Sequence, residues 1–167
     1  MTSILKVSEI QDPTNGNTAL TVDTSGYVTF PVNTVSFFAY GLNANNANNG
    51  NLIFLNVQHN LRNCYSTSTG EFTAPIKGVY NFAVNVLRNT GDANLSFKVD
   101  NALTYLTGNS SQDQAAQYMR ATLYDHGSIT INLQLNAGQK VTAFVGSSAT
   151  VYSNYNNFSG HLIAPVA

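Results

Sequence analysis

The sequence predicts an all-β protein, and three observations lead to this prediction. Apolar and polar residues alternate along several stretches, and the clearest alternation runs through Tyr80, Phe82, Val84 and Val86. A period of two places one face of a strand inward, so we expect this stretch at the centre of a core. Glycine, proline and asparagine separate the stretches where turns are needed. No segment has a convincing helical repeat beyond a turn near residues 112–117, which favours the all-β class.

Composition limits the classes of function. The chain has 167 residues, enough for one domain with an appendage and a substantial core. Charged residues make up only 9% of it and asparagine is its commonest residue, which is typical of extracellular β-proteins and fibres. The formal net charge is −1, so no electrostatic attraction favours nucleic acid or an anionic membrane. No apolar run is long enough to cross a bilayer.

The first 31 residues are predicted to form a separate N-terminal arm, followed by a head of residues 32–167. Within the arm, residues 19–23 and 27–30 have the pattern of two short strands around a turn at 24–26. So few residues can hardly bury a core of their own. The arm is therefore interpreted either as a segment that packs on partner subunits or as a plug that docks into a larger assembly.

The head is interpreted as a succession of strands separated by polar turns and loops. Pro75 ends one strand because it has no N–H for a ladder, and Gly78 allows a bend before the next. Strands are expected at residues 35–42, 52–57, 63–68, 71–74, 79–86, 95–99, 103–105, 129–135, 141–145 and 158–164. Turns are expected at residues 59–60, 89–94 and 136–139, and polar loops at 43–51, 108–117 and 146–157.

The run from Gly70 to Phe82 reads Gly-Glu-Phe-Thr-Ala-Pro-Ile-Lys-Gly-Val-Tyr-Asn-Phe. With Tyr65 before it, this run resembles the signature of the globular C1q domain, in the C1q/tumour-necrosis-factor superfamily. The resemblance covers residues 35–165 and implies a ten-stranded jelly-roll β-sandwich that assembles as a compact homotrimer, binds other molecules and is not an enzyme. The residues that match family positions in the core, the turns or the subunit contacts are Phe37, Phe54, Tyr65, Gly70, Phe72, Pro75, Gly78, Tyr80, Phe82, Gly138, Phe158 and Gly160.

A second resemblance concerns the arm. Residues 4–31, from Ile-Leu-Lys-Val-Ser to Tyr-Val-Thr-Phe-Pro, resemble the opening of many tail-fibre and other virion-surface proteins of bacteriophages. Neither a signal peptide nor the Gly-X-Y stalk of animal C1q relatives is seen. Together the two resemblances imply a virion surface protein of the tail-fibre or receptor-binding type. Its arm would bind other virion proteins, and its head would bind a host surface glycan or protein.

Two alternatives stay open. The same residues suit a capsid decoration or head-fibre protein, in which the arm carries a structural function and the far end of the head needs no specificity. The other alternative is a secreted ligand of the C1q/tumour-necrosis-factor type, which export machinery would distinguish. Cys64 has no partner for an internal disulfide, and no leader sequence is seen. We therefore expect synthesis in the reducing cytoplasm of a bacterial host and a location on the virion.

The direction of the strands predicts which loops share an end of the head. If the strands at 35–42 and 158–164 are antiparallel, the loops at 43–51 and 147–157 lie together at a tip opposite the termini. A tyrosine flanked by asparagines there suits stacking on a sugar ring while the amides bond its hydroxyls. The tyrosines could instead cap the loop or pack between protomers, and the asparagine loop could be a solvated linker. The candidate ligand-binding residues are Asn45, Asn46, Asn48, Asn49, Tyr152, Asn154, Tyr155 and Asn156.

Catalytic and metal sites find little support. Asp125 and His126 adjoin, but no nucleophile elbow or carboxylate pair forms a motif. The remaining histidines, His59 and His161, are spaced unlike any metal motif. A calcium ion is an alternative because Asp92 and Asp100 lie near turns, yet no dense aspartate run forms a calcium loop. We expect no enzyme activity, no metal and no cofactor.

Overall fold

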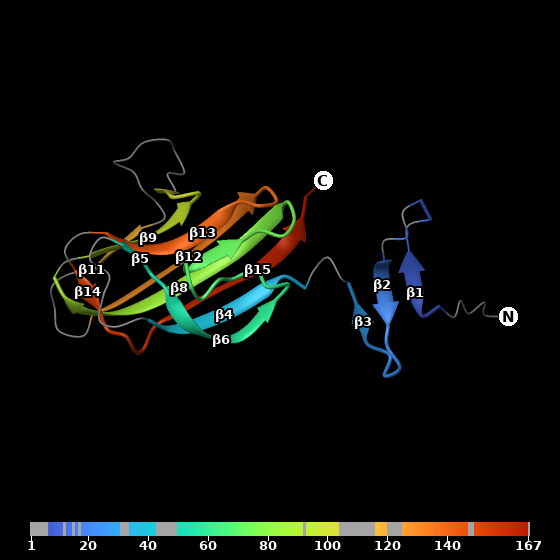
Figure 1. Cartoon of the computed structure of the whole chain (residues 1–167), viewed down its shortest axis with the longest axis horizontal. Helices are drawn as coiled ribbons and strands as arrows, with labels where there is room; N and C mark the ends of the chain where they lie inside the picture. Colours follow the sequence, from blue (N-terminus) through green and yellow to red (C-terminus); the bar gives the residue numbers. More distant parts are fainter. Residues whose placement is uncertain are drawn as a thin grey trace. The chain divides into compact units, whose positions relative to one another are not determined.

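The computed structural model contains two compact units, Met1–Thr34 and Val35–Ala167 (Figure 1). Among the residues that the structure describes, every secondary-structure element is a β-strand. No helix in that part of the chain is long and apolar enough to span a membrane. The described residues are 7–11, 13–14, 16, 18–30, 34–42, 50–91, 93–103, 116–119, 125–146 and 149–166.

The N-terminal unit is a small antiparallel sheet in the order β1-β2-β3. Its strands are β1 (Glu9–Gln11), β2 (Thr18–Val22) and β3 (Val28–Thr29). The turn between β2 and β3 forms because the Asp23 carboxylate accepts hydrogen bonds from the backbone N–H groups of Ser25 and Tyr27, at 2.8 and 2.9 Å. β2 and β3 were expected, whereas β1 is too short and too polar to stand out in the sequence.

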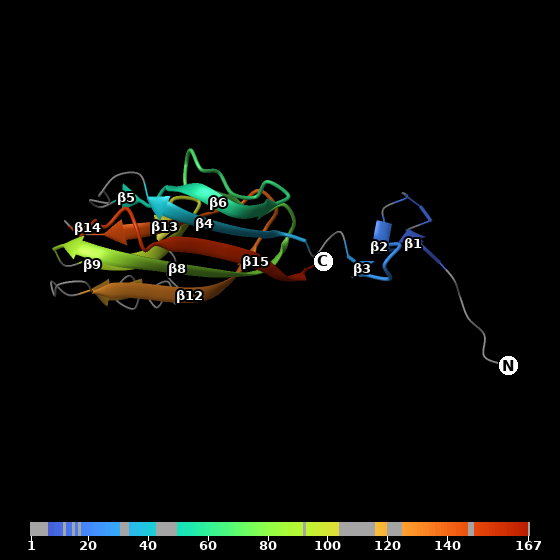
Figure 2. The same cartoon turned by 90° about the horizontal axis from the view of Figure 1, so that it is seen from below.

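The larger unit is a sandwich of two sheets, which confirms the predicted all-β class. Sheet I has the strand order β12-β8-β15-β4-β6, with β14 paired to the end of β8. Figure 2 shows this order from β6 at the top of the sandwich to β12 at the bottom. The strands of sheet I are β4 (Ser36–Leu42), β6 (Phe54–Leu61), β8 (Gly78–Thr90), β12 (His126–Leu135), β14 (Thr150–Val151) and β15 (Asn157–Pro165).

Sheet II covers the inner face of sheet I. Its strand order is β10-β9-β13-β5, with β11 paired to β9 and β7 paired to β13. Every strand pair of both sheets is antiparallel. The strands of sheet II are β5 (Gly50–Asn51), β7 (Glu71–Thr73), β9 (Ala93–Val99), β10 (Ala102–Leu103), β11 (Ala116–Met119) and β13 (Lys140–Gly146).

Aromatic side chains fill the space between the two sheets. The ring of Phe37 stacks on Tyr65 with centroids 4.8 Å apart and meets the edge of Phe158 at the same distance. Gly160 leaves room for these rings, because a Cβ at this position would lie 2.6 Å from Phe82 and 2.7 Å from Phe37. Several of the aromatic residues that match family positions in the sequence are fully buried in this core: Phe37, Phe54, Phe72, Tyr80, Phe82 and Phe158.

The Gly70 to Phe82 motif joins the two sheets. Gly70 has a φ of +73°, and a Cβ there would lie 2.5 Å from the Leu52 carbonyl oxygen, so both the conformation and the space require glycine. The half-buried Pro75 follows β7, and β8 begins at Gly78, where a Cβ would meet Leu162. The motif therefore forms the connection through which the chain crosses from β7 in sheet II to β8 in sheet I.

The chain reverses after β6 later than predicted. The expected turn at residues 59–60 is wrong, because β6 continues through both and the reversal occurs at Arg62 and Asn63, with φ values of 62° and 50°. Asn60 looked like a turn residue, but its amide holds Tyr65: Oδ1 accepts from the Tyr65 N–H at 3.0 Å and Nδ2 donates to the Tyr65 carbonyl at 2.8 Å. A side chain here replaces a strand partner.

Three further expectations about secondary structure need correction. Residues 63–68 form no strand, and only an isolated bridge joins Tyr65 to Phe72. The predicted loop at 146–157 contains the short strand β14, and β5 occupies the end of the predicted loop at 43–51. Such two-residue strands carry no periodic signal. Residues 43–49 and 104–115 lie outside the described residues.

Candidate functional site

The loop ends of β4 and β15 meet at one end of the head. These strands pair antiparallel, with Asn157 opposite Tyr40 and His161 opposite Ser36. The Leu42 N–H donates to the Ser153 carbonyl at 2.9 Å, which ties the end of β4 to the loop before β15. Among the described residues, the end of β4 and the loop before β15 therefore lie together, as the antiparallel pairing predicted. The predicted Asn45, Asn46, Asn48 and Asn49 lie outside the described residues.

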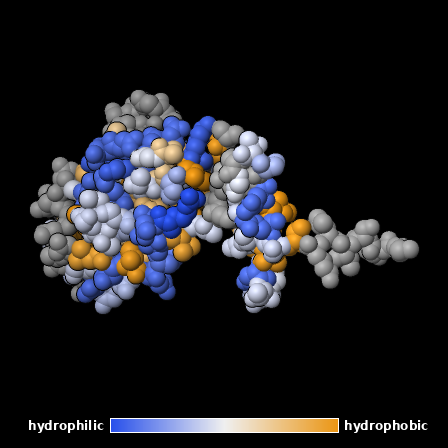
Figure 3. All heavy atoms as spheres, turned by 45° about the vertical axis from the view of Figure 1, so that its right-hand side comes forward, coloured by the Kyte–Doolittle hydropathy of each residue, from blue (hydrophilic) through white to orange (hydrophobic). Residues whose placement is uncertain are grey.

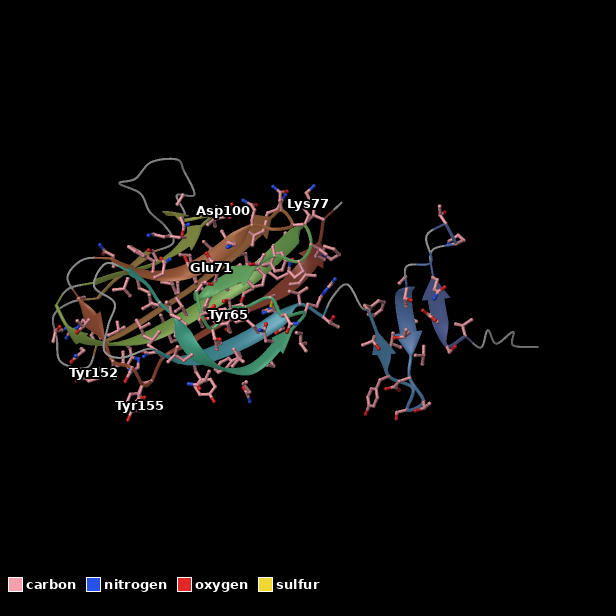
Figure 4. All side chains as sticks on the ribbon, in the orientation of Figure 1. Tyr65, Glu71, Lys77, Asp100, Tyr152 and Tyr155 are labelled. Carbon is pink, nitrogen blue, oxygen red and sulfur yellow. The ribbon has the colours of Figure 1, made fainter. Side chains whose placement is uncertain are left out.

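The opposite end of the head carries its first and last described residues. The Leu162 N–H donates to the Val35 carbonyl at 3.0 Å, and the Val166 N–H donates to the Lys77 carbonyl at 3.1 Å. In Figure 4, Lys77 is labelled at this end and the two candidate tyrosines at the other. The head is thus joined to the preceding chain at one end and presents the tip at the other.

The tip loop exposes one tyrosine and holds the other partly in place. Tyr155 is 76% exposed and has a left-handed backbone, with φ of 65°. Asn154 beside it is exposed as well. Tyr152 is half-buried, and its N–H donates to the Leu87 carbonyl at 2.9 Å. Figure 4 shows both tyrosines at the tip. The exposed pair Asn154 and Tyr155 is therefore the part of the described loop that a ligand can reach.

Asn156 has a different place from its predicted neighbours. Only 4% of this residue is exposed, and its Oδ1 accepts the Leu87 N–H at 2.8 Å. Its Nδ2 donates to the Tyr152 carbonyl. Both ends of the amide thus hold the loop on the end of β8. In this chain Asn156 positions the loop and does not offer its amide to a ligand, contrary to its inclusion among the candidate ligand-binding residues.

We expect Asn156→Ala to lower the free energy of unfolding by about 1 to 3 kcal/mol, because the buried Leu87 N–H would lose its acceptor. Asn154→Ala is the matched control, since its side chain is exposed and the change should stay within about 0.5 kcal/mol. Urea denaturation followed by circular dichroism measures both. Equal effects for the two variants would contradict the role given to Asn156.

Arg88 is a tip residue that the sequence analysis did not single out. It lies in β8 and is 3% exposed. Its Nη1 donates to the Gly91 carbonyl at 3.1 Å, while Nε has no hydrogen-bond partner among the described residues. Burial of a guanidinium is costly unless it is well paired. An arginine directly after the apolar alternation of β8 was the available signal, but the predicted strand stopped at residue 86 and left Arg88 out.

The outer face of sheet I, the side away from the core, has one half built from amides and hydroxyls. The Asn81 Nδ2 donates to the Asn132 Oδ1 across β8 and β12 at 2.8 Å. The Asn85 Nδ2 donates to the Asn157 Oδ1 across β8 and β15 at 2.9 Å, and the Ser128 hydroxyl donates to Asn85. The hydrogen-bonding groups of these side chains are thus paired with one another within the single chain.

The other half of this face carries the exposed aromatic and aliphatic side chains. On β4, Phe38 and Tyr40 alternate with buried residues, and their ring centroids lie 6.3 Å apart. Tyr40, Leu61 of β6 and Ile163 of β15 are exposed in the single chain, at 45%, 48% and 49%. Five strands therefore share an outer face that is amide-rich over β12 and β8, and that carries the aromatic rings of β4 beside Leu61, Asn56 and His59 of β6.

Formal charges avoid sheet I almost completely. Arg88, which is buried, is the one Asp, Glu, Lys or Arg in its six strands. Sheet II differs, because Glu71 and Lys140 form an ion pair at 2.8 Å and Lys98 lies 3.6 Å from the centroid of the Phe144 ring. The hydrogen bond from Lys140 lowers the pKa of Glu71. The two outer faces of the sandwich thus differ in charge: that of sheet II carries charged side chains, and that of sheet I carries almost none.

The residues weighed as metal ligands are placed as follows. Both oxygens of Asp100 are occupied, since Oδ1 accepts the Lys140 N–H and Oδ2 accepts the Gln139 amide, each at 2.9 Å. These bonds lower the pKa of Asp100. The His59 Nε2 is hydrogen-bonded to the Ser36 hydroxyl at 2.8 Å. Within the described ranges, no group of three or more His, Cys, Asp or Glu gathers as a metal site would require, and Asp92 falls outside them.

Two comparisons with known proteins complete the description. The sequence model of the C1q domain matches residues 36–163. Among solved structures, the globular domain of zebrafish complement 1qA protein has a similar fold, with a TM-score of 0.61. Its sequence is 16% identical, and the match covers 80% of this chain and 100% of that one. This structural similarity concerns the fold alone.

Proposed function

The chain belongs to the C1q domain family, and from this premise we propose that it acts as a homotrimer that binds a target at the tip of its head. Family membership supports a binding module, because C1q domains are typically non-enzymatic. The proposal adds the surface through which the copies meet and the end at which the target binds. Each of these additions comes from the geometry of the head.

The uncharged outer face of sheet I carries the proposal of a homotrimer. Protein interfaces are depleted in charged residues and enriched in aromatic ones at their centre. This face has both properties, with Tyr40 and Leu61 exposed and no charged side chain outside the buried Arg88. The amide side chains on the other half of this face are already hydrogen-bonded to one another. Burying them in an interface therefore leaves few polar groups without a partner.

A cyclic trimer suits a face of two unlike halves. In a ring, each subunit contacts its neighbour through two different patches, so the same residues need not meet across an axis. The half over β4 and β6, with its exposed Tyr40 and Leu61, can cover part of the next copy while the amide half over β12 and β8 is covered in turn. This arrangement uses the whole face and leaves the charged outer face of sheet II in water.

Three tips on one rigid head would bind a repetitive target better than one. The second and third contacts become intramolecular and gain effective concentration, so weak single sites suffice. Tyr155 offers an aromatic ring and Asn154 an amide at each tip, a combination that fits a glycan ring and its hydroxyls. We therefore propose a host surface glycan as the first target to test, with a surface protein as the alternative.

We also propose that the protein works on a bacteriophage virion, as a tail-fibre or receptor-binding protein made in the cytoplasm of the host. The resemblance of residues 4–31 to the opening of virion-surface proteins, noted from the sequence alone, is the reason for proposing this role. The attachment of the arm at the end of the head opposite the tip supports it as well. Cys64 is a free, buried thiol, which suits synthesis in a reducing compartment.

A capsid decoration protein is the second candidate function, because the apolar residues exposed in the arm suit a structural attachment. Exchange of the tip loop separates the two candidates: host adsorption changes if the head is an adhesin and stays constant if the protein decorates the capsid. A secreted ligand of the tumour-necrosis-factor type is a third candidate that the family allows. Attachment to purified phage particles would exclude it.

We expect Tyr155→Ala to reduce glycan binding by at least tenfold and to leave the solution mass unchanged, because the side chain is exposed and supports no packing. The measurement is binding of the labelled full chain to a glycan array, since stacking of this kind needs the aromatic ring. Tyr27→Ala is the matched control, as Tyr27 is 74% exposed but lies in the arm. Unchanged binding by the Tyr155 variant would remove the tip from the proposal.

A further inference from the structure

We propose that the N-terminal arm forms a second trimeric core, in which the apolar face of its sheet packs against the same face in two further copies of the arm. This inference rests on the proposed homotrimer. It assigns a partner to the arm, namely other copies of this chain. It also chooses the first of the two interpretations of the arm that the sequence left open.

The two faces of the arm sheet differ in polarity. Ile10 pairs with Leu20, and Val22 pairs with Val28. Because paired residues share a face and alternate residues along a strand do too, these four side chains lie together on one face. Phe30 continues the same alternation beyond β3. No charged residue belongs to this set.

The opposite face is polar and internally bonded. Thr21 and Thr29 share it, and their hydroxyls are hydrogen-bonded at 3.1 Å. The Glu9 carboxylate accepts hydrogen bonds from the side chains of Thr18 and Gln11, of which the Thr18 bond lowers the pKa of Glu9 most. This face therefore suits water, and the apolar face is the one that needs a partner.

The arm cannot cover its apolar face by itself. Ile10, Val28 and Phe30 remain 47%, 51% and 49% exposed. Figure 3 shows hydrophobic residues at the surface of the N-terminal unit. A sheet of three short strands has only one layer, and such a sheet needs packing against a second layer to be stable. A second layer must come from outside the arm.

Other copies of the arm are the best source of that layer. Only residues 31–34 separate Phe30 from the start of the larger unit at Val35, a reach of about 14 Å when extended. In a homotrimer, three arms would thus be tethered near one another at high effective concentration. The faces carry no charge that would repel a copy, and three identical apolar faces can close around one axis.

Disulfide trapping tests this packing in the full chain. Val28→Cys places a thiol on the apolar face, and Thr29→Cys places one on the polar face of the same strand. The unsubstituted chain is the blank, because Cys64 is buried and burial raises its pKa to about 11, which keeps the thiol unreactive. Mild oxidation at micromolar concentration, denaturing electrophoresis and light scattering are the measurements.

The inference predicts a two-chain band for Val28→Cys that contains up to about two thirds of the chains, since three thiols around an axis form one disulfide. For Thr29→Cys, the fraction of chains in the two-chain band should be at least fivefold smaller. Dilution should not change the fraction for either variant. A trimer in which both variants, or neither, cross-link overturns the inference and leaves the proposed homotrimer standing. A monomeric chain overturns both proposals.

Hydrogen exchange gives a second measurement that needs no oxidation. Burial of the apolar face should protect the backbone amides of β2, so Val28→Asp should speed their exchange at least tenfold. Thr29→Asp, on the water-facing side, is the matched control and should change exchange much less. Equal acceleration by both substitutions would show that the face is not covered, and would overturn the inference.

Discussion

Gly160→Ala should lower the free energy of unfolding of the head by about 3 kcal/mol or more, and the variant should accumulate poorly when it is expressed. The added Cβ would lie 2.6 Å from one carbon of the Phe82 ring and 2.7 Å from the Phe37 ring. Both rings belong to strands that pair with or flank β15, and both are almost fully buried. Phe37 packs against Phe158, and Phe82 packs against both Phe158 and Phe97, so overpacking cannot be relieved locally.

Gly138→Ala is the matched control for this prediction. Gly138 has a φ of +86°, yet nothing lies within 4 Å of a Cβ built on it. The substitution therefore costs only the backbone strain, about 1 to 2 kcal/mol. Urea denaturation of both variants compares the two costs. A smaller loss for Gly160→Ala than for Gly138→Ala would contradict the close packing of the core.

Ser159→Arg should convert the trimer to single chains at micromolar concentration, an effect of at least a thousandfold on the dissociation constant. Ser159 lies at the middle of sheet I, opposite Ala83 of β8 and Phe38 of β4. An arginine there would place three like charges inside the proposed contact, with no carboxylate in the strands of sheet I to pair with them.

Ser68→Arg adds the same side chain at an exposed turn and serves as the control. Its solution mass should equal that of the unsubstituted chain. Circular dichroism and thermal unfolding of Ser159→Arg show whether the single chains remain folded, as they should, because the new side chain points away from the core. A trimeric Ser159→Arg protein would move the subunit contact to another surface.

The sequence predicted the elements that have a strong period of two. Tyr80, Phe82, Val84 and Val86 are fully buried along β8, as their alternation indicated. The Gly70 to Phe82 motif also predicted the family and the sandwich, because the glycines and aromatics serve one packed crossing between the sheets. Position-specific packing of this kind leaves a clear trace in a sequence.

Asparagine was the main source of error. Asn60 and Asn156 look like loop residues by composition, but both use their amides to hold backbone groups of other segments. Whether an amide bonds backbone, a neighbouring amide or a ligand depends on its tertiary surroundings. The amide pairs Asn81–Asn132 and Asn85–Asn157 on sheet I could not be predicted for the same reason, since only the strand register brings these residues together.

The assembly surface also required the structure. The low charge of the chain is a property of its composition, but its distribution between two sheets depends on strand order. Sheet I joins strands that are far apart in the sequence, and their shared lack of charge appears only when β12, β8, β15, β4 and β6 are placed together. The apolar face of the arm emerges in the same way, from the pairing of Ile10 with Leu20 and of Val22 with Val28.

The solution mass of the full chain, measured by multi-angle light scattering, tests the proposed homotrimer most directly. The uncharged face of sheet I predicts a mass of three times 18.0 kDa that persists on dilution to the micromolar range. A mass of 18.0 kDa at that concentration would contradict the homotrimer, and with it the trivalent tip and the trimeric arm.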